Sequence, residues 1–129
     1  MLTRRIISTI SFCLYLAAVA YLCFAKPDDM PQLPNIWFGL PSDKIAHFLM
    51  FMPFPFLGYL AFYISEMSIG RKLILMIGLL ATGAIAAIGT EQVQALLQYR
   101  TFDIKDLLAD SIGLSFGGVL TLIYIIVKK

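Results

Sequence analysis

The sequence predicts an all-α membrane protein, a bundle of four transmembrane helices in a single domain over residues 1–129. Apolar residues make up 60% of the chain and charged residues only 14%, whereas soluble domains average roughly 45–50% and about 25%. The mean hydropathy of +0.84 points the same way. Four long apolar stretches supply the helices, at residues 6–25, 43–64, 73–98 and 105–127.

The first stretch, residues 6–25, follows Arg4 and Arg5 and has the 20 residues that a helix needs to cross a bilayer. A cleavable signal peptide would have a shorter apolar core and small residues before its cleavage site. We therefore expect a retained N-terminal helix. The next segment carries four prolines between residues 26 and 42, a density that prevents regular helix.

The second stretch contains Pro53 and Pro55 near its middle. Each proline lacks the amide hydrogen of a helical bond, so this helix is predicted to be kinked. The third stretch is rich in Gly and Ala, which lets helices approach closely in a bilayer. The fourth places Gly113 and Gly117 in a GxxxG spacing, which predicts either packing within the chain or a homo-oligomer.

The distribution of charge predicts the orientation. With four spans, both termini share one side of the membrane. That side holds six basic residues and one acid, a net charge of +5, and the other side holds four basic residues and seven acids, a net charge of −3. Because basic residues favour the cytoplasmic side, both termini are predicted to be cytoplasmic. The polar residues of the last three helices then gather at the outer face.

Polar side chains concentrate at three helix ends. Asp43 and His47 are spaced i, i+4 at the start of the second helix, so they share a face. Glu91 and Gln94 are spaced i, i+3 near the end of the third helix. Since each polar group is costly if it faces lipid unpaired, these side chains are expected to meet one another or a ligand.

A second set of polar residues leads into the fourth helix. Asp103, Asp106 and Asp110 are spaced i, i+3, i+7, and Arg100 lies in the loop before them. The two sets predict a water-accessible pocket for an anionic or lipid-linked headgroup, in which Arg100 holds the anion. The predicted ligand-binding residues are Arg100, Gln94, Asp103, Asp106 and Asp110.

Three of these polar residues are candidates for proton transfer. Imidazole is the side chain that ordinarily titrates near neutral pH, and Asp43 could orient His47. Glu91 could act as an acid or a base. The candidate catalytic residues are therefore His47, Glu91 and Asp43. The same groups could equally hold a divalent cation, but no spacing is diagnostic of one, so neither a metal nor a cofactor is predicted.

Three alternatives to headgroup binding stay open. The cluster could be a polar lock in which Arg100 pairs with Glu91 or Asp110. It could be the site of a membrane hydrolase or transferase that acts on lipid-linked phosphates, which needs a nucleophile or a metal. The chain could also be a non-catalytic helix-packing partner in a membrane complex. Nucleic acid is excluded as a partner, because the net charge is only +2 and no basic patch is present.

Two segments resemble the VanZ-like family of small bacterial membrane proteins. The segment DKIAHFLMF at residues 43–51 is similar to that family's D-K-x-x-H-F-x-x-F. The segment from Glu91 to Gly113 resembles its E-x-x-Q, R-x-x-D-x-x-D and N-x-x-G series. The similarity covers about residues 40–125, so residues 6–25 are an additional N-terminal helix. It departs at Asp110, where the family commonly has Asn, and this places a second carboxylate one turn from Asp106.

The resemblance implies a multi-pass protein of the bacterial cell envelope, in the inner or plasma membrane. Its implied partners are membrane lipids or a lipid-linked envelope precursor. The family's namesake is associated with glycopeptide-antibiotic resistance, but a shared fold does not by itself carry a shared function. Resistance is therefore not inferred for this chain.

Overall fold

The computed structural model describes residues 2–24, 36–37, 39–97 and 103–128. It is all-helical apart from one short pairing of two-residue strands, β1 (Ile36–Trp37) with β2 (Leu40–Pro41). The helices are α1 (Leu2–Phe24), α2 (Ser42–Phe51), α3 (Pro53–Phe62), α4 (Ile69–Leu96) and α5 (Ile104–Lys128). The four-span prediction is confirmed, because α1, α2 with α3, α4 and α5 are each long and apolar enough to cross a membrane.

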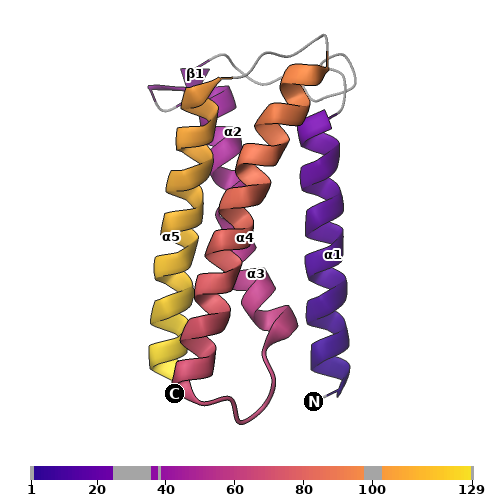
Figure 1. Cartoon of the computed structure of the whole chain (residues 1–129), viewed down its shortest axis with the longest axis vertical. Coiled ribbons are helices and arrows are strands. Elements are labelled where there is room, and N and C mark those ends of the chain that lie inside the picture. Colours follow the sequence, from indigo (N-terminus) through magenta and orange to yellow (C-terminus); the bar gives the residue numbers. More distant parts are fainter. Residues whose placement is uncertain (1, 25–35, 38, 98–102, 129) are drawn as a thin grey trace.

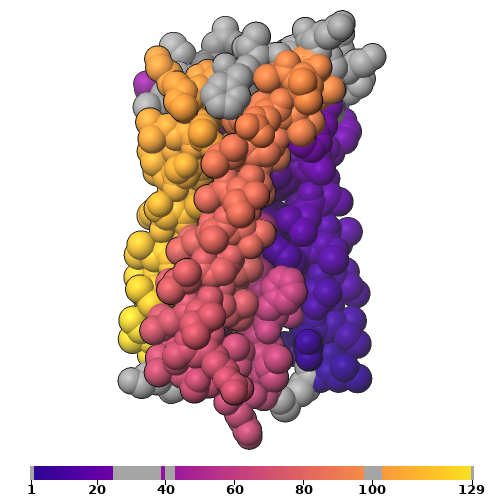
Figure 2. Space-filling model, in the orientation of Figure 1, coloured from indigo at the N-terminus to yellow at the C-terminus, as the bar shows by residue number. Residues whose placement is uncertain are grey.

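The helices run alternately up and down, so α1 begins and α5 ends at one end of the bundle (Figure 1). We call this the termini end. The opposite end, where α2 begins, α4 ends and α5 begins, is called the polar end. Figure 2 shows α4 crossing one face of the molecule diagonally between α5 and α1. Large apolar side chains on the outside of the bundle are exposed, including Leu14, Ile74, Ile85 and Val119, as lipid-facing positions require.

The second span is interrupted where its prolines predict. Helix α2 ends at Phe51 and α3 begins at Pro53, with Met52 between them. Because proline has no amide hydrogen, Pro53 and Pro55 cannot donate to the carbonyls one turn before them. The hydroxyl of Tyr15 in α1 donates to the carbonyl of Met50 beside this break.

The core lies between the second span, α4 and α5, and Phe12 of α1 joins it from the side. Phe12 of α1 contacts Phe54 and Phe62 of α3, with ring centroids 5.6 and 5.9 Å apart. Buried apolar side chains continue the core along the other helices, namely Phe51, Tyr59, Leu79, Ala87, Leu114 and Ile125.

Helix α2 packs chiefly against α5, and the two glycines of the GxxxG spacing lie in this contact. A Cβ atom at Gly113 would overlap the carbonyl oxygen of Phe48, and one at Gly117 would overlap that of Met52. The glycines thus serve packing within the chain, which is one of the two readings of their spacing. A homo-oligomer through them stays a prediction.

Candidate functional site

Seven charged or titratable side chains meet at the polar end, and we call them the polar cluster. Helix α2 contributes three, α4 one and α5 two, while one stands directly before α5. They are Asp43, Lys44, His47, Glu91, Asp103, Asp106 and Asp110. Glu91 and Asp110 are completely buried, and His47 is 6% exposed.

Lys44 joins the start of α2 to the start of α5. Its Nζ lies 2.7 Å from Asp43 Oδ2 and 2.8 Å from Asp103 Oδ2. It also donates to Asp106 Oδ1. Sequence reasoning did not select Lys44, although its position one turn before His47 puts both side chains on the face of α2 that meets α5.

Asp103 also caps α5. Its Oδ1 accepts from the amide of Lys105 at 2.9 Å, which satisfies one of the free amides in the first helical turn. The hydrogen bond from Lys44 and this amide together hold the pKa of the Asp103 carboxyl below its usual value. Asp103 therefore stays ionised and keeps Lys44 at the entrance of α5.

His47 lies deeper, among three carboxyl groups. Its Nδ1 is 2.7 Å from Asp110 Oδ1 and 3.8 Å from Glu91 Oε1. The partner of His47 is thus Asp110 on α5, and the expected partner Asp43 is instead exposed and paired with Lys44. The reason is that α2 packs its His47 face against α5. On the other side of the ring, Nε2 is 3.5 Å from Asp106 Oδ2.

Two carboxyl oxygens of the cluster have no hydrogen-bond partner within the described part of the chain, although both are buried. They are Glu91 Oε1 and Asp110 Oδ2. The other oxygen of Glu91 accepts from the amide of Asp103 at 3.4 Å. A buried carboxylate oxygen without a donor is unfavourable, so each of these two atoms calls for a proton or a cation.

Three ligand atoms of the cluster fit around one cation. His47, Glu91 and Asp106 each place one such atom within 4.8 Å of the others, and so do Asp43, Asp103 and Asp106. Imidazole with carboxylates is a donor set that divalent transition metals accept. The cluster's five carboxyl groups and single lysine also leave an excess of negative charge.

Gln94 lies apart from these groups and joins α4 to α1. Its Nε2 donates to the carbonyl oxygen of Cys23 at 2.7 Å, and Cys23 lies in the last turn of α1. Gln94 is 2% exposed. Arg100 lies outside the described residues, as does any pairing of Arg100 with Glu91 or Asp110, so its predicted anion contact stays a prediction.

Replacing Gln94 with leucine is expected to loosen α1. The hydrogen bond from Gln94 to the carbonyl of Cys23 would be lost, which costs about 1 kcal/mol. Thermal unfolding in detergent should show a lower midpoint for Gln94→Leu. The matched control is Gln92→Leu on the exposed side of the same helix turn, for which no loss is expected. Equal midpoints for both variants would contradict the contact.

Comparisons with known proteins give a family and one relative. The VanZ/LLP1 family model matches residues 12–127, from the middle of α1 nearly to the end of α5. The uncharacterized protein C11E3.10 of Schizosaccharomyces pombe is 33% identical over 114 residues, which are 88% of this chain and 61% of that protein. The chain therefore spans about three fifths of the length of this relative. No solved structure matches.

Proposed function

Because the chain belongs to the VanZ/LLP1 family and has four helices that are apolar enough to cross a membrane, we propose that its polar cluster binds an anionic or lipid-linked headgroup through a divalent cation. His47, Glu91 and Asp106 hold the cation. Arg100, in the loop between α4 and α5, contacts the anion directly. The charge asymmetry of the sequence supports an outer-face position of the cluster, in the plasma membrane of a bacterial envelope.

The observation that carries this proposal is the pair of buried carboxyl oxygens beside His47 that accept no hydrogen bond from any described residue. An anionic headgroup alone would be repelled by the cluster's surplus of carboxylates. A divalent cation removes that repulsion, supplies a partner to Glu91 Oε1, and leaves coordination positions for phosphate oxygens. A bound cation thus explains how a site rich in carboxylates can bind an anionic ligand.

Cation binding is the first step to test. Purified protein in detergent is titrated with Mn²⁺, and the free ion is followed by its electron paramagnetic resonance signal. Glu91→Gln should lower Mn²⁺ affinity by at least ten- to a hundredfold, the order of magnitude seen when a metal site loses a supporting group. The control is Glu66→Gln, an exposed acid at the termini end, which should not change the affinity. If Mn²⁺, Zn²⁺ and Mg²⁺ all fail to bind the parent protein, the cation is excluded.

Headgroup binding is tested separately with a polyprenyl phosphate in lipid nanodiscs. The protein should retain this lipid in the presence of the cation and release it when EDTA is added. Arg100→Ala should weaken retention, whereas Arg71→Ala, at the other end of α4, should not. Retention that is insensitive to both EDTA and Arg100→Ala would contradict the proposal.

A membrane hydrolase or transferase is the second candidate. It is supported by the buried pair of His47 and Asp110, because a carboxylate-oriented imidazole beside a metal-bound water can remove its proton. Release of inorganic phosphate from a polyprenyl diphosphate would identify this activity, and His47→Gln should abolish it. Turnover that persists in His47→Gln would exclude His47 as the base.

A further inference from the structure

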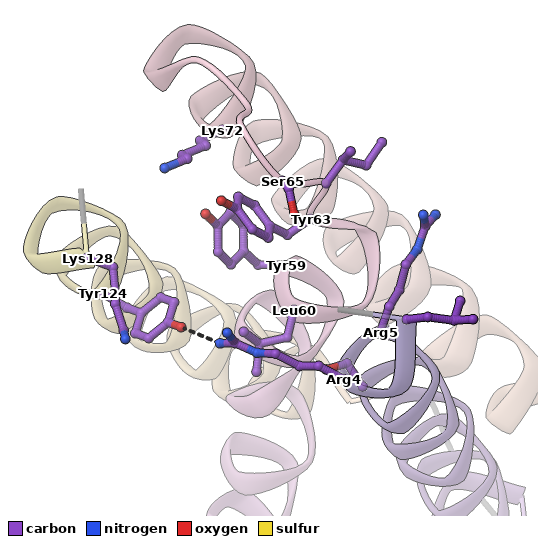
Figure 3. Close-up of a pocket in the computed structure, with 12 residues that line it drawn as sticks. Arg4, Arg5, Tyr59, Leu60, Tyr63, Ser65, Lys72, Tyr124 and Lys128 are labelled. Atoms are coloured by element: carbon purple, nitrogen blue, oxygen red, sulfur yellow. Dashed lines mark hydrogen bonds between the residues drawn. The ribbon is translucent and has the colours of Figure 1, made fainter.

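A basic pocket of about 450 Å³ lies at the termini end of the bundle, at the opposite end from the polar cluster. Figure 3 shows the residues that line it. The first turns of α1 and α4 and the last turns of α3 and α5 surround it. Four cations line it, Arg4, Arg5, Lys72 and Lys128. We name these and the other lining residues the basic pocket.

No acid among the described residues forms a salt bridge with the cations of this pocket. Every salt bridge found among the described residues belongs to the polar cluster. The one acid at the termini end in the described ranges is Glu66, which is exposed and does not line the pocket. Figure 3 places Arg5 and Lys128 on opposite sides of the space. Like charges that converge without a counter-charge repel one another, and a bound anion would remove that repulsion.

Tyrosines supply hydrogen-bond donors to the same space. Tyr59 is 3% exposed and lines the pocket, but its hydroxyl has no hydrogen-bond partner among the described residues. Its ring lies beside that of Tyr63, with centroids 5.5 Å apart, and Lys72 Nζ is 5.5 Å from the Tyr63 ring (Figure 3). The hydroxyl of Tyr59 is therefore available to donate to an oxygen ligand in the pocket.

Arg4 and Tyr124 complete the donor set. An Arg4 guanidinium nitrogen donates to Tyr124 Oη at 3.4 Å, which leaves the tyrosine's own hydroxyl hydrogen for another acceptor. Guanidinium, ammonium and phenol donors around one space suit the oxygens of a phosphate group.

The apolar residues of the pocket favour a phospholipid over free phosphate as its ligand. Leu2, Leu60 and Ile64 also line the pocket, which stands at the ends of helices that are long and apolar enough to cross a membrane. We propose that the basic pocket binds the headgroup of an anionic phospholipid that carries more than one phosphate. Free phosphate would use the cations but leave the apolar wall exposed to water, whereas the glycerol and upper acyl chain of a lipid cover it. This proposal does not rest on the function of the polar cluster.

The experiment compares two neighbouring residues at the start of α4. Lys72 lines the pocket, while Arg71 is exposed and does not. Binding of cardiolipin, which carries two phosphates, is measured by native mass spectrometry at physiological ionic strength. Lys72→Gln should weaken binding about fivefold, as expected for one basic residue at an anionic headgroup, and Arg4→Gln together with Lys72→Gln about 25-fold. Arg71→Gln should change it less than twofold.

Tyr59→Phe is the second variant, since it removes one oxygen and keeps the ring. It should weaken cardiolipin binding while thermal unfolding in lipid-free detergent stays unchanged. Equal losses for Arg71→Gln and Lys72→Gln would overturn the proposal in favour of general surface charge. Equal binding of phosphatidylcholine, or displacement of cardiolipin by inorganic phosphate at similar concentration, would overturn it as well. Mn²⁺ binding at the polar cluster is measured on the same variants, so either proposal can fail alone.

Discussion

Gly117→Ala is expected to destabilise the bundle more than any other single-methyl change in the described chain. The added Cβ would overlap the carbonyl oxygen of Met52. This oxygen belongs to the backbone, so it cannot move away by a change of side-chain rotamer. Overpacking of this kind costs about 1–3 kcal/mol or more. Thermal unfolding in detergent micelles should therefore show a midpoint lowered by several degrees, with loss of monodisperse protein.

Gly78→Ala is the matched control, because a Cβ built at Gly78 meets no described atom within 4 Å apart from its chain neighbours and the adjacent backbone of its own helix. Alanine also favours helix by about 1 kcal/mol over glycine, so this variant should be as stable as the parent or more so. The two variants add the same methyl group to long membrane helices, and they should change the unfolding midpoint in opposite directions. If Gly117→Ala instead lowers the oligomeric state while the unfolding midpoint stays constant, the glycine serves an interface between chains.

Lys44→Met is expected to have the second largest effect, on both stability and the site. Without the ammonium group, the carboxylates of Asp43, Asp103 and Asp106 face one another at the polar end. Lys44 is about one fifth exposed, so solvent moderates the repulsion, and we expect a loss of about 2 kcal/mol. The measurement is again thermal unfolding in detergent.

Lys105→Met provides the comparison, since Lys105 is exposed and its ammonium group makes no salt bridge within the described residues. A double variant of Lys44→Met with Asp106→Asn should recover part of the stability, because one of the repelling charges is removed. Failure of this rescue would show that Lys44 acts by packing and not by charge.

A fall in pH should weaken the ion pair between Lys44 and Asp103. The pKa of Asp103 is lowered in the folded protein by Lys44, so its contribution to stability is complete above the ordinary aspartate pKa of about 3.9. That contribution is lost as the pH falls through the lower folded value. Lys44→Met should be less sensitive to this fall in pH than the parent.

The four helices follow from the sequence because each apolar stretch is long enough to span a bilayer and is bounded by polar or proline-rich segments. The break near Pro53 follows from the missing amide hydrogen. Partners within the site are harder to derive. Gln94 shares a helix end with Glu91, but a spacing of three residues turns the two side chains about 60° apart. Glu91 therefore reaches α5 while Gln94 reaches α1.

Lys44 was missed for a different physical reason. A lysine in the first turn of a membrane helix usually extends its flexible chain to the interface, so sequence alone gives it no partner. Its three carboxylates come from residues one, 59 and 62 positions away. Only the packing of α2 on α5 brings the last two within reach.

The glycines that hold α2 against α5 also fix the alignment of the two helices along their axes. Gly113 faces Phe48 and Gly117 faces Met52, so two notches one turn apart engage two successive turns of the facing backbone. A slide by one helical pitch, about 5.4 Å, would disengage one notch and move His47 away from Asp110. The contact between His47 and Asp110 therefore depends on two glycines that lie several residues further along α5 than Asp110.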